Sequence, residues 1–373
     1  MVAEFLIEAL GETVMRTSWA LVKGGARASA RVLKRGAKKI STAKTQRDIS
    51  IAAQVVKNGG IVAFPTETVY GLGGDALNPR AVQNIYAAKG RPGDNPLILH
   101  VATIPQFLKL ANHVPDYAIA LANAYWPGPL TLVVKKNSRL PSWVGGHPEN
   151  NATTVGIRIP QHPTALALIK ATGRPIAAPS ANKAGRPSPT SAQHVKDDFG
   201  KKGEVDFIIE GEISDVGLES TVVDVTGDTP VILRPGAITA DMIKETTGMG
   251  ADSVLKTDTP RAPGMKYRHY APKAPMEILN GSGENIANYI FAQPFAPDEK
   301  IGVLAHSTVI KKLAKQKNIV PIVINSKNLF ASLRHFDKQN VTHIYAQKVH
   351  GTGIAVAIMD RMLKAAEGNI KDV

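Results

Sequence analysis

The stretch between residues 61 and 100 constrains the fold of this chain more tightly than any other. A short apolar run leads into a loop rich in Pro, Thr and Gly. A helix is expected to start at the Asn78-Pro79 pair and to end at Gly90, and a second apolar run ends at His100. This order of strand, loop, helix, loop and strand predicts an open α/β sheet, which binds ligands in the loops outside its strand ends.

Two cations flank the end of the predicted helix. Lys89 alone would be explained by the helix dipole, which favours positive charge at a helix C-terminus. Arg91 lies beyond the break at Gly90, in a loop whose Pro and Gly residues hold an extended side chain in place. The two cations together predict a site for an anionic ligand.

The glycines after the first loop are similar to a dinucleotide-binding fingerprint. Residues 71–76, Gly-Leu-Gly-Gly-Asp-Ala, fit its loose form, but residues 65–70 separate them from the strand and the helix starts only after Asn78. A nicotinamide or flavin enzyme is therefore only a minor alternative, and the chain has no Walker A sequence. We expect residues 71–74 to form the turn that lets the loop double back.

Composition narrows the classes of function. The length of 373 residues predicts two or three domains with a sizeable core. The chain has no Cys, which excludes disulfides, thiolate metal sites and a Cys nucleophile. No apolar run reaches the length that spans a bilayer, so no membrane association is expected.

Residues 1–44 form a basic N-terminal extension, and residues 1–47 together account for half of the net charge of +14. Three interpretations stay open. The segment is similar to an organelle transit peptide, although Glu4, Glu8 and Glu12 argue against this. It could also be a basic arm for RNA or an acidic partner, or a dispensable, partly helical tail.

The hydrophobic pattern after the extension predicts two domains. Residues 45–247 are expected to form a twisted, open, mixed sheet with helices, and residues 248–275 lose periodicity and are interpreted as a linker. Residues 276–373 alternate strands and helices, which predicts a smaller three-layer α/β domain. The expected strands are 61–64, 130–134, 154–159, 176–178, 205–209, 221–225, 231–233, 301–304, 320–324 and 343–346, and the expected helices after residue 100 are 105–111, 115–125, 164–172, 239–247, 309–317, 329–336 and 354–366.

Several polar residues follow or interrupt the predicted strands. Ser180 and Asn182 could present a hydroxyl and an amide to a ligand, but both types are also ordinary turn and cap residues. Arg158 lies among apolar neighbours and needs a carboxylate partner from the protein or from a ligand. His100 alone is more typical of a structural donor. No nucleophile elbow surrounds Ser180 or Ser220, so a Ser/His/Asp triad is not supported.

The linker contains an unusual segment, residues 262–272. It concentrates Lys266, Tyr267, Arg268, His269 and Tyr270 between Gly and Pro residues. Basic residues interleaved with aromatic residues can hold phosphate and stack on a base, and the flanking Gly and Pro residues predict a lid that moves.

These motifs, taken together, resemble those of the threonylcarbamoyl-AMP synthases in their long, two-domain form. The resemblance covers residues 45–373. It is carried by Pro65-Thr-Glu-Thr-Val-Tyr-Gly-Leu72, Lys89-Gly-Arg91, Pro179-Ser-Ala-Asn182, Leu218-Glu-Ser-Thr-Val222, Leu233-Arg-Pro-Gly236 and Ala262-Pro-Gly-Met-Lys-Tyr-Arg-His-Tyr-Ala-Pro272.

The resemblance implies a catalytic domain that binds ATP and threonine, a linker with a tyrosine-bearing lid and a Rossmann-like second domain. The implied enzyme is a nucleotidyltransferase, an L-threonylcarbamoyladenylate synthase. It would use L-threonine, bicarbonate or CO2, and ATP with Mg²⁺, and would release pyrophosphate. No protein ligand for the metal is identified.

The resemblance also implies roles for individual residues. Lys89, Arg91, Ser180 and Asn182 would be the catalytic signature. Thr68, His100, Arg158 and Ser220 would bind threonine, with Arg158 on its carboxylate. The implied ATP contacts are Arg91, Asn95, Thr154, Ser180, Ser188 and Arg234, with Tyr267 or Tyr270 closing over the phosphates.

The implied product serves threonylcarbamoyladenosine formation in tRNA, next to the anticodon. A downstream tRNA threonylcarbamoyl-transfer complex is therefore an expected partner, a weak contact with tRNA is possible, and the expected location is the cytoplasm, with organelle targeting by the extension left open. The alternative is a non-catalytic RNA-binding module that uses a basic concave face.

Overall fold

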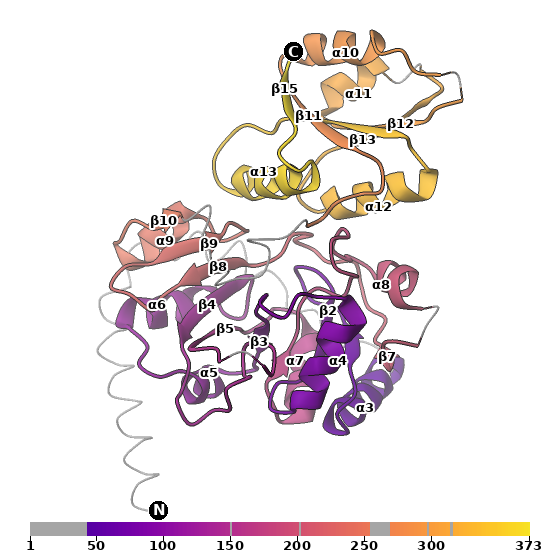
Figure 1. Cartoon of the computed structure of the whole chain (residues 1–373). Coiled ribbons are helices and arrows are strands. Elements are labelled where there is room, and N and C mark those ends of the chain that lie inside the picture. The colour runs from indigo at the N-terminus through magenta and orange to yellow at the C-terminus, as the bar shows by residue number, and fades with distance from the viewer. Residues whose placement is uncertain (1–42, 150, 201–202, 254–268, 297, 314–315) are drawn as a thin grey trace, which may run out of the picture.

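The computed structural model describes residues 43–149, 151–200, 203–253, 269–296, 298–313 and 316–373. The interpretations of the N-terminal extension fall almost entirely outside these residues, as does the linker from 254 to 268. The described chain forms two α/β domains, each built on one sheet (Figure 1). Among the described residues, no helix has the length and apolar character needed to cross a lipid bilayer.

The sheet of the first domain has ten strands. They are, in spatial order, β10 (Asp252–Ser253), β9 (Val231–Arg234), β8 (Thr221–Asp224), β4 (Leu130–Lys135), β5 (Thr154–Arg158), β3 (Ile98–His100), β6 (Ile176–Ala177), β2 (Gly71–Asp75), β1 (Val62–Phe64) and β7 (Phe207–Ile208). The pairs β3–β5 and β4–β8 are parallel, whereas β4–β5 and β8–β9 are antiparallel. The predicted open, mixed sheet is confirmed.

Helices cover both faces of this sheet. They are α3 (Ala43–Lys57), α4 (Pro79–Lys89), α5 (Ile104–Leu110), α6 (Asp116–Tyr125), α7 (Pro163–Thr172), α8 (Ala192–Phe199) and α9 (Ala240–Thr247). Alternation along β1 separates two apolar cores, because successive side chains of a strand point to opposite faces. Val62 and Phe64 pack with α3 and α7, whereas Ile61 and Ala63 belong to the core that contains residues of α4, α5 and α6.

Helix α4 has the ends that the sequence predicts. The Asn78 side chain accepts hydrogen bonds from the backbone N–H groups of Arg80 and Ala81, and Pro79 occupies the first turn. Gly90 ends the helix with a left-handed φ of 61°. Lys89 is therefore the last helical residue, and the chain turns sharply into the cationic loop.

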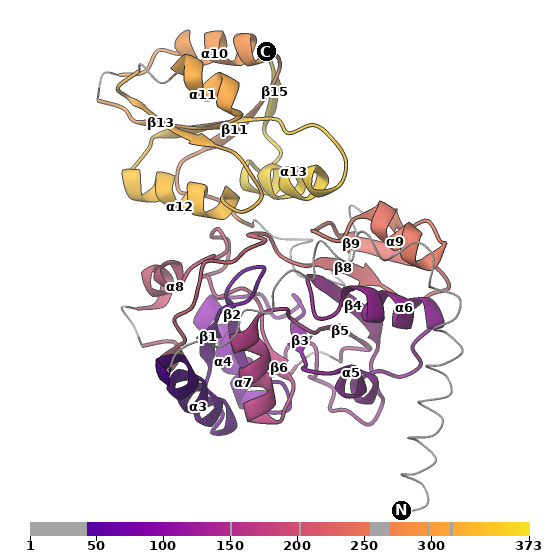
Figure 2. The same ribbon diagram turned by 180° about the vertical axis from the view of Figure 1, so that it is seen from behind.

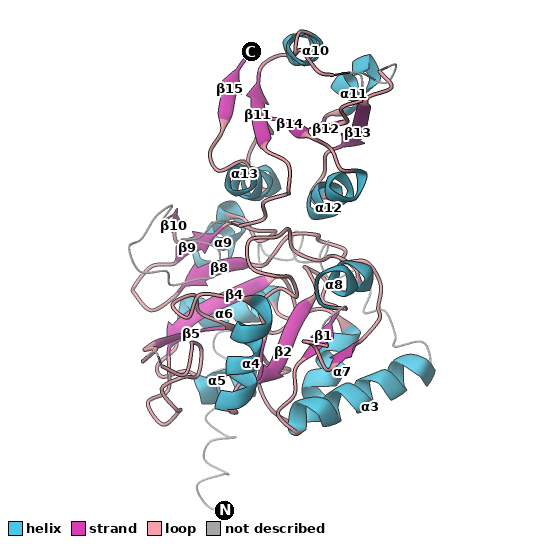
Figure 3. Cartoon of the chain, turned by 45° about the vertical axis from the view of Figure 1, so that its right-hand side comes forward, coloured by secondary structure: helices cyan, strands magenta, loops and turns pink. Residues whose placement is uncertain are grey.

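The second domain is a parallel five-stranded sheet between two layers of helices, as predicted (Figures 1 and 3). Helices α10 and α11 cover the face away from the first domain, and α12 and α13 cover the face toward it (Figure 2). The strands, in spatial order, are β13 (Ile319–Val323), β12 (Ile301–Ala305), β14 (His343–Gln347), β11 (Met276–Asn280) and β15 (Ile370–Asp372), and the helices are α10 (Gly283–Phe291), α11 (Ser307–Leu313), α12 (Leu329–Gln339) and α13 (Ile354–Ala365).

The two domains share an apolar core at their boundary. Val69 and Leu218 of the first domain and Tyr270 of the linker belong to the same buried cluster as Phe330 of α12 and Met362 of α13. The contact is close, because a Cβ at Gly217 would lie 2.5 Å from the Cα of Lys327 in the second domain. The second domain is thus packed against the first through buried surface.

The expected turn at residues 71–74 is wrong, because these residues form most of strand β2. They pair antiparallel with β1, and all are buried. Glycine is needed there for space, since a Cβ at Gly73 would lie 2.6 Å from both the Phe64 ring and the Ile176 side chain. The side chains of neighbouring strands fill the space next to β2, because its glycines have no side chains.

Several elements were not expected from the sequence. The expected strands 205–209 and 221–225 do not neighbour each other: β7 pairs with β1 at one edge, while β8 lies near the other. Asp252 and Ser253, which were interpreted as linker, instead form strand β10 and pair with β9. The remaining unexpected elements are α8, β11, α10 and β15.

Candidate active site

A cavity of about 390 Å³ opens at the strand ends of the first sheet. His269 and Tyr270, at the end of the linker, line one side of it. Loops after β1, α4 and β6, the loop before β8 and the end of β9 form its walls. The structure brings most of the predicted site residues to this cavity, namely Thr68, Lys89, Arg91, Asn95, His100, Arg158, Ser180, Asn182, Ser220, Arg234 and Tyr270.

Three predicted ATP contacts are not among the residues lining the cavity. Thr154 pairs with Lys135 in the ladder between β4 and β5. Ser188 is buried one layer behind the wall, where its hydroxyl donates to Glu219 Oε1 at 2.6 Å. Tyr267 lies outside the described residues. For the first two, the structure therefore does not place the side chain where a ligand in the cavity would touch it.

The loop after β1 is shaped by its own threonines. The Thr66 hydroxyl donates to the Val69 carbonyl at 2.6 Å and accepts from the backbone N–H groups of Thr68 and Val69. Such side-chain bonds to nearby backbone groups stabilise tight turns. The turn directs the Thr68 hydroxyl toward Arg158, which donates to it from Nη1 at 2.8 Å.

Lys89 points from the end of α4 into the loop after β6. Its ammonium group donates to the carbonyl oxygens of Ser180 and Asn182, at 2.5 and 2.6 Å. Burial, followed by the charge of Arg91, lowers the pKa of Lys89 well below its ordinary value. Lys89 thus joins two sequence motifs while contributing positive charge to the cavity wall.

Arg91 is held by the loop in which it lies. It donates to the Asn95 carbonyl from Nε at 3.0 Å, and from Nη2 to Asn95 Oδ1 at 2.7 Å and to the Pro96 carbonyl at 2.8 Å. Burial lowers its pKa to about 10. No carboxylate is among these partners, so the guanidinium retains its charge for a ligand.

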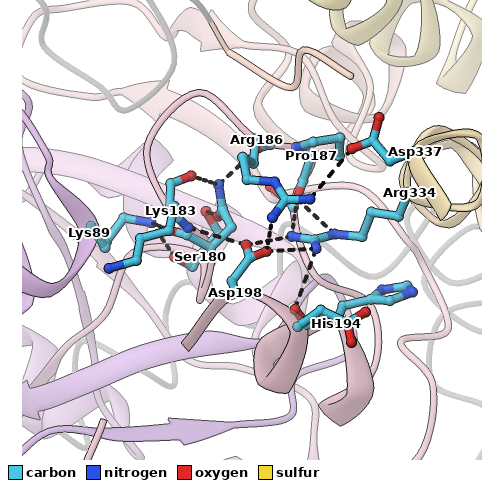
Figure 4. Close-up of polar contacts among 12 residues, drawn as sticks. Lys89, Ser180, Lys183, Arg186, Pro187, His194, Asp198, Arg334 and Asp337 are labelled. Carbon is cyan, nitrogen blue, oxygen red and sulfur yellow. Dashed lines mark hydrogen bonds and ion pairs between the residues drawn. The ribbon is translucent and has the colours of Figure 1, made fainter. Parts of the chain in front are cut away.

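Ser180 and Asn182 form a hydrogen-bonded pair after β6. The Ser180 hydroxyl donates to Asn182 Oδ1 at 2.6 Å, and the Asn182 amide donates to the carbonyls of Lys183 and Arg186 at 2.8 and 2.9 Å. The loop continues into a cluster of charges shared with the second domain (Figure 4). Asp198, whose side chain is fully buried, accepts from Arg186 at 2.7 Å and from Arg334 of α12 at 2.8 Å.

Arg158, at the end of β5, has a carboxylate partner in the protein. Its Nη2 lies 2.6 Å from Glu67 Oε1 as an ion pair, although the angle is not that of a hydrogen bond. His100 lies beside it on β3, and burial, followed by the charge of Arg158, lowers the pKa of His100 from 6.5 to about 3. Within the described residues, His100 Nδ1 and both Glu67 carboxylate oxygens lack hydrogen-bond partners. These buried atoms mark a corner that a polar ligand would complete.

Ser220 and Arg234 form the opposite wall. The Arg234 guanidinium donates to the Ser220 carbonyl from Nε at 3.1 Å and to the Ser220 hydroxyl from Nη2 at 3.2 Å. The hydroxyl is also 2.8 Å from Thr131 Oγ1 of β4. Burial lowers the pKa of Arg234, as it does for Lys89 and Arg91.

The lining residues that were not predicted as part of the site include Thr66, Glu219 and His269. Thr66 and Glu219 lie inside motifs that the sequence shows, and His269 lies in the basic, aromatic segment of the linker. Burial, followed by the charge of Arg91, lowers the pKa of His269 from 6.5 to about 3. The motif context was a signal for all three, but nothing local indicated that the Glu219 carboxylate faces the cavity.

The arrangement favours an anionic ligand. Lys89, Arg91, Arg158 and Arg234 line one cavity. Burial lowers the pKa of Lys89, Arg91 and Arg234, because it disfavours their charged forms. A bound anion would reverse that effect, since an opposite charge nearby stabilises the protonated cation. Fixed donors around one anion can also stabilise charge that develops during a reaction.

Comparisons with known proteins match both domains. Residues 54–236 match the Sua5, YciO and YrdC family model described as telomere recombination, and residues 238–367 match the model described as the C-terminal domain of threonylcarbamoyl-AMP synthase. A threonylcarbamoyl-AMP synthase of Pyrococcus abyssi is 43% identical over 326 residues, which cover 85% of this chain and 94% of the relative. One of Bacillus subtilis is 42% identical over 335 residues, which cover 86% and 94%.

A solved structure agrees with the fold of both domains. The crystal structure of P. abyssi Sua5 complexed with L-threonine matches this chain with a TM-score of 0.77 at 40% identity. The match covers 87% of this chain and 96% of the other.

Proposed function

The chain belongs to the threonylcarbamoyl-AMP synthase family, and from this we propose that it converts L-threonine, bicarbonate or CO2, and ATP into L-threonylcarbamoyladenylate and pyrophosphate. The observation that carries the proposal is the single cavity in which four cations and the Ser180–Asn182 pair meet. These groups suit two anionic substrates, one with a carboxylate and the other with a triphosphate.

We assign threonine to the corner formed by Thr68, His100 and Arg158. The unpartnered His100 Nδ1 supports this assignment, because a buried polar atom without a partner is costly unless a ligand or water completes it. His100 is neutral and can accept a hydrogen bond. A substrate carboxylate at Arg158 has to share the guanidinium with Glu67, which already lies 2.6 Å away.

We assign ATP to the wall formed by Arg91, Asn95, Ser180 and Arg234, with Tyr270 as the described tyrosine at its edge. Arg91 is held by carbonyl and amide oxygens, so its charge is not cancelled by the groups that orient it. Arg234 is oriented by the carbonyl and hydroxyl oxygens of Ser220. Planar guanidinium groups suit phosphate oxygens because they donate two parallel hydrogen bonds.

The proposed reaction has two steps. The threonine amine first attacks the carbon of bicarbonate, and loss of water leaves a carbamate. A carbamate oxygen then attacks the α-phosphorus of ATP, and the bond to the pyrophosphate leaving group breaks. Phosphoryl chemistry of this kind depends mainly on positioning and charge stabilisation, which Lys89 and Arg91 would supply without a strong general base.

Mg²⁺ would enter with ATP. The described residues hold no group of three or more His, Cys, Asp or Glu side chains that could bind a metal. Glu219 is a carboxylate at the cavity, but its two oxygens already accept from Ser188 and Arg361. The lining residues therefore do not form a protein site for Mg²⁺, which is often held largely by substrate phosphates and water.

We further propose that the product is consumed by a tRNA threonylcarbamoyl-transfer complex, in the cytoplasm. The alternative of an RNA-binding module is less well supported, because Lys89, Arg158 and Arg234 are buried at a cavity, with 3 to 4% of their surface exposed. An RNA backbone is bound by exposed cations.

The decisive experiment measures pyrophosphate release by the full chain with MgATP and bicarbonate, with and without L-threonine. We expect release that depends on threonine. Arg91→Ala should lower kcat/KM by at least about a hundredfold, because one fixed donor to transition-state charge is worth about that much. Arg80→Ala, an exposed residue at the other end of α4, is the matched control and should retain activity. Folded protein that releases no pyrophosphate with threonine would disprove the proposal.

A further inference from the structure

Arg361 of the second domain reaches into the first domain. It lies on α13, and its side chain is completely buried. Its Nε donates to Glu219 Oε2 at 2.9 Å and its Nη1 donates to the Pro235 carbonyl at 2.9 Å. Both acceptors belong to the first domain, so this side chain crosses the domain boundary.

The two acceptors bracket the wall assigned to substrates. Glu219 directly precedes Ser220, and Pro235 directly follows Arg234. Ser220 and Arg234 are joined to each other by the hydrogen bonds of their side chains. Arg361 therefore contacts both flanks of the Ser220–Arg234 pair, the Glu219 side chain on one and the Pro235 carbonyl on the other.

Glu219 needs this partner. It is 6% exposed and is the only carboxylate among the described residues that line the cavity. Burial acts to raise its pKa, but the charges of Arg361 and Arg234 and the hydrogen bond from Ser188 outweigh burial and keep the pKa below its ordinary value. An uncompensated buried charge is strongly unfavourable, so without Arg361 the carboxylate would move toward the remaining cation, Arg234.

Arg361 is itself held on its own helix. Asp360 Oδ2 accepts from its Nη1 at 2.6 Å, and the Tyr270 ring of the linker lies 5.8 Å from its guanidinium carbon. Asp360 also pairs with Lys364, one turn further along α13. The guanidinium is thus held by Asp360 of its own helix and by the Tyr270 ring as well as by its two acceptors in the first domain.

We propose that Arg361 is a positioning residue of the active site, which holds Glu219 away from Arg234 and so keeps Ser220 and Arg234 in the geometry that binds substrates. The inference rests on the proposed function for the identity of the ligands. The second domain of the same chain then holds part of the site in place without contacting the substrates.

The test is a double-mutant cycle in the full chain, read by MgATP affinity in titration calorimetry and by KM in pyrophosphate release. Arg361→Met should weaken ATP binding by about tenfold or more, since a carboxylate released toward Arg234 competes with phosphate. Adding Glu219→Gln should recover most of that loss, because the neutral amide does not draw Arg234 away. Lys338→Ala, which removes an exposed ion pair with Asp197 at the same domain boundary, is the control and should bind ATP normally.

The outcomes separate the inference from the function on which it rests. A double variant that binds ATP as weakly as Arg361→Met overturns the inference, because removing the charge of Glu219 should restore ATP binding if that carboxylate is what draws Arg234 away from phosphate. If Arg361→Met does not fold, Arg361→Lys takes its place. A lysine cannot donate to Glu219 and Pro235 together in the same way, and unchanged ATP affinity in that variant also overturns the inference. Absence of threonine-dependent pyrophosphate release in the unmutated chain contradicts only the proposed function.

Discussion

Individual residues of this site differ in how their charge is balanced. Arg91 and Arg234 are oriented by carbonyl, amide and hydroxyl oxygens, whereas Arg158 lies against the Glu67 carboxylate. The hydrogen-bond partners of Arg91 include no carboxylate, so its charge contributes more positive potential to the cavity than that of Arg158. This difference agrees with the division into a triphosphate wall and an amino-acid corner.

His100 gives a residue-scale prediction about acid stability. Its pKa is about 3 in the folded chain and about 6.5 in the unfolded chain, so between these values the unfolded state binds the extra proton. The free energy of unfolding is then unaffected by this group above pH 6.5 and falls below it, by about 1.4 kcal/mol per pH unit. Between pH 7.5 and pH 5, urea unfolding of His100→Gln should lose about 2 kcal/mol less than the unmutated chain.

The control for this measurement is His306→Gln, at an exposed position of the second domain. It should show the same loss between the two pH values as the unmutated chain. If His100→Gln also shows that full loss, His100 is not the neutral, buried group described above.

The residues of the site were predicted unevenly. Lys89, Arg91, Ser180 and Asn182 lie in short motifs whose chemistry is visible locally, and the structure brings them together. Glu219 was missed because its orientation depends on an arginine 142 residues later, which no local pattern indicates. Thr154 and Ser188 do not line the cavity, because their positions are set by the sheet ladder and by a buried contact with Glu219.

At the scale of elements, strand β2 gives a prediction about packing. Gly73→Val should lower the free energy of unfolding by about 1 to 3 kcal/mol, the usual cost of overpacking a core. The added side chain would meet the Phe64 ring and Ile176. Gly227→Ala is the matched control, since a Cβ there meets nothing within 4 Å, and it should unfold within about 0.5 kcal/mol of the unmutated chain. Equal stability of the two variants in urea would contradict the role assigned to Gly73.

The elements that the sequence predicted well have strong local signals. Helix α4 has an Asn-Pro start and a Gly end, and the predicted alternation of the second domain is reproduced in β12 to α13. The glycines of β2 were wrongly interpreted as a turn, because glycine also occurs in strands where neighbouring side chains leave no space for a Cβ. Strands β10 and β15 are two and three residues long, too short for a hydrophobic period.

At the scale of the whole molecule, Arg334 gives a prediction about the domain boundary. Arg334→Met leaves the buried Asp198 with Arg186 as its remaining guanidinium partner, and the Pro187 carbonyl loses its donor. We expect a loss of about 3 to 5 kcal/mol in the free energy of unfolding, the cost of breaking a buried ion pair. Asp198→Asn in the same background should recover part of this loss.

Lys338→Ala tests whether the effect comes from burial. Lys338 lies on the same helix as Arg334 and pairs with Asp197 at 2.8 Å, but half of its side chain is exposed. Exposed pairs contribute about 0 to 1 kcal/mol, so chemical denaturation should separate the two variants clearly. Similar losses for both would show that the boundary is held by something other than the buried charges.

The contact between Glu219 and Arg361 also has a consequence during protein synthesis. The two residues are 142 positions apart, and Asp198 and Arg334 are 136 apart. At about 5 to 20 residues per second, Glu219 leaves the peptidyl-transfer centre roughly 7 to 28 seconds before its arginine is made. Through that interval the first domain can fold as a unit, but Glu219 and Asp198 lack Arg361 and Arg334 as partners. The rate of translation over the second domain therefore sets how long the nascent chain exists before Arg361 can contact Glu219 and Pro235.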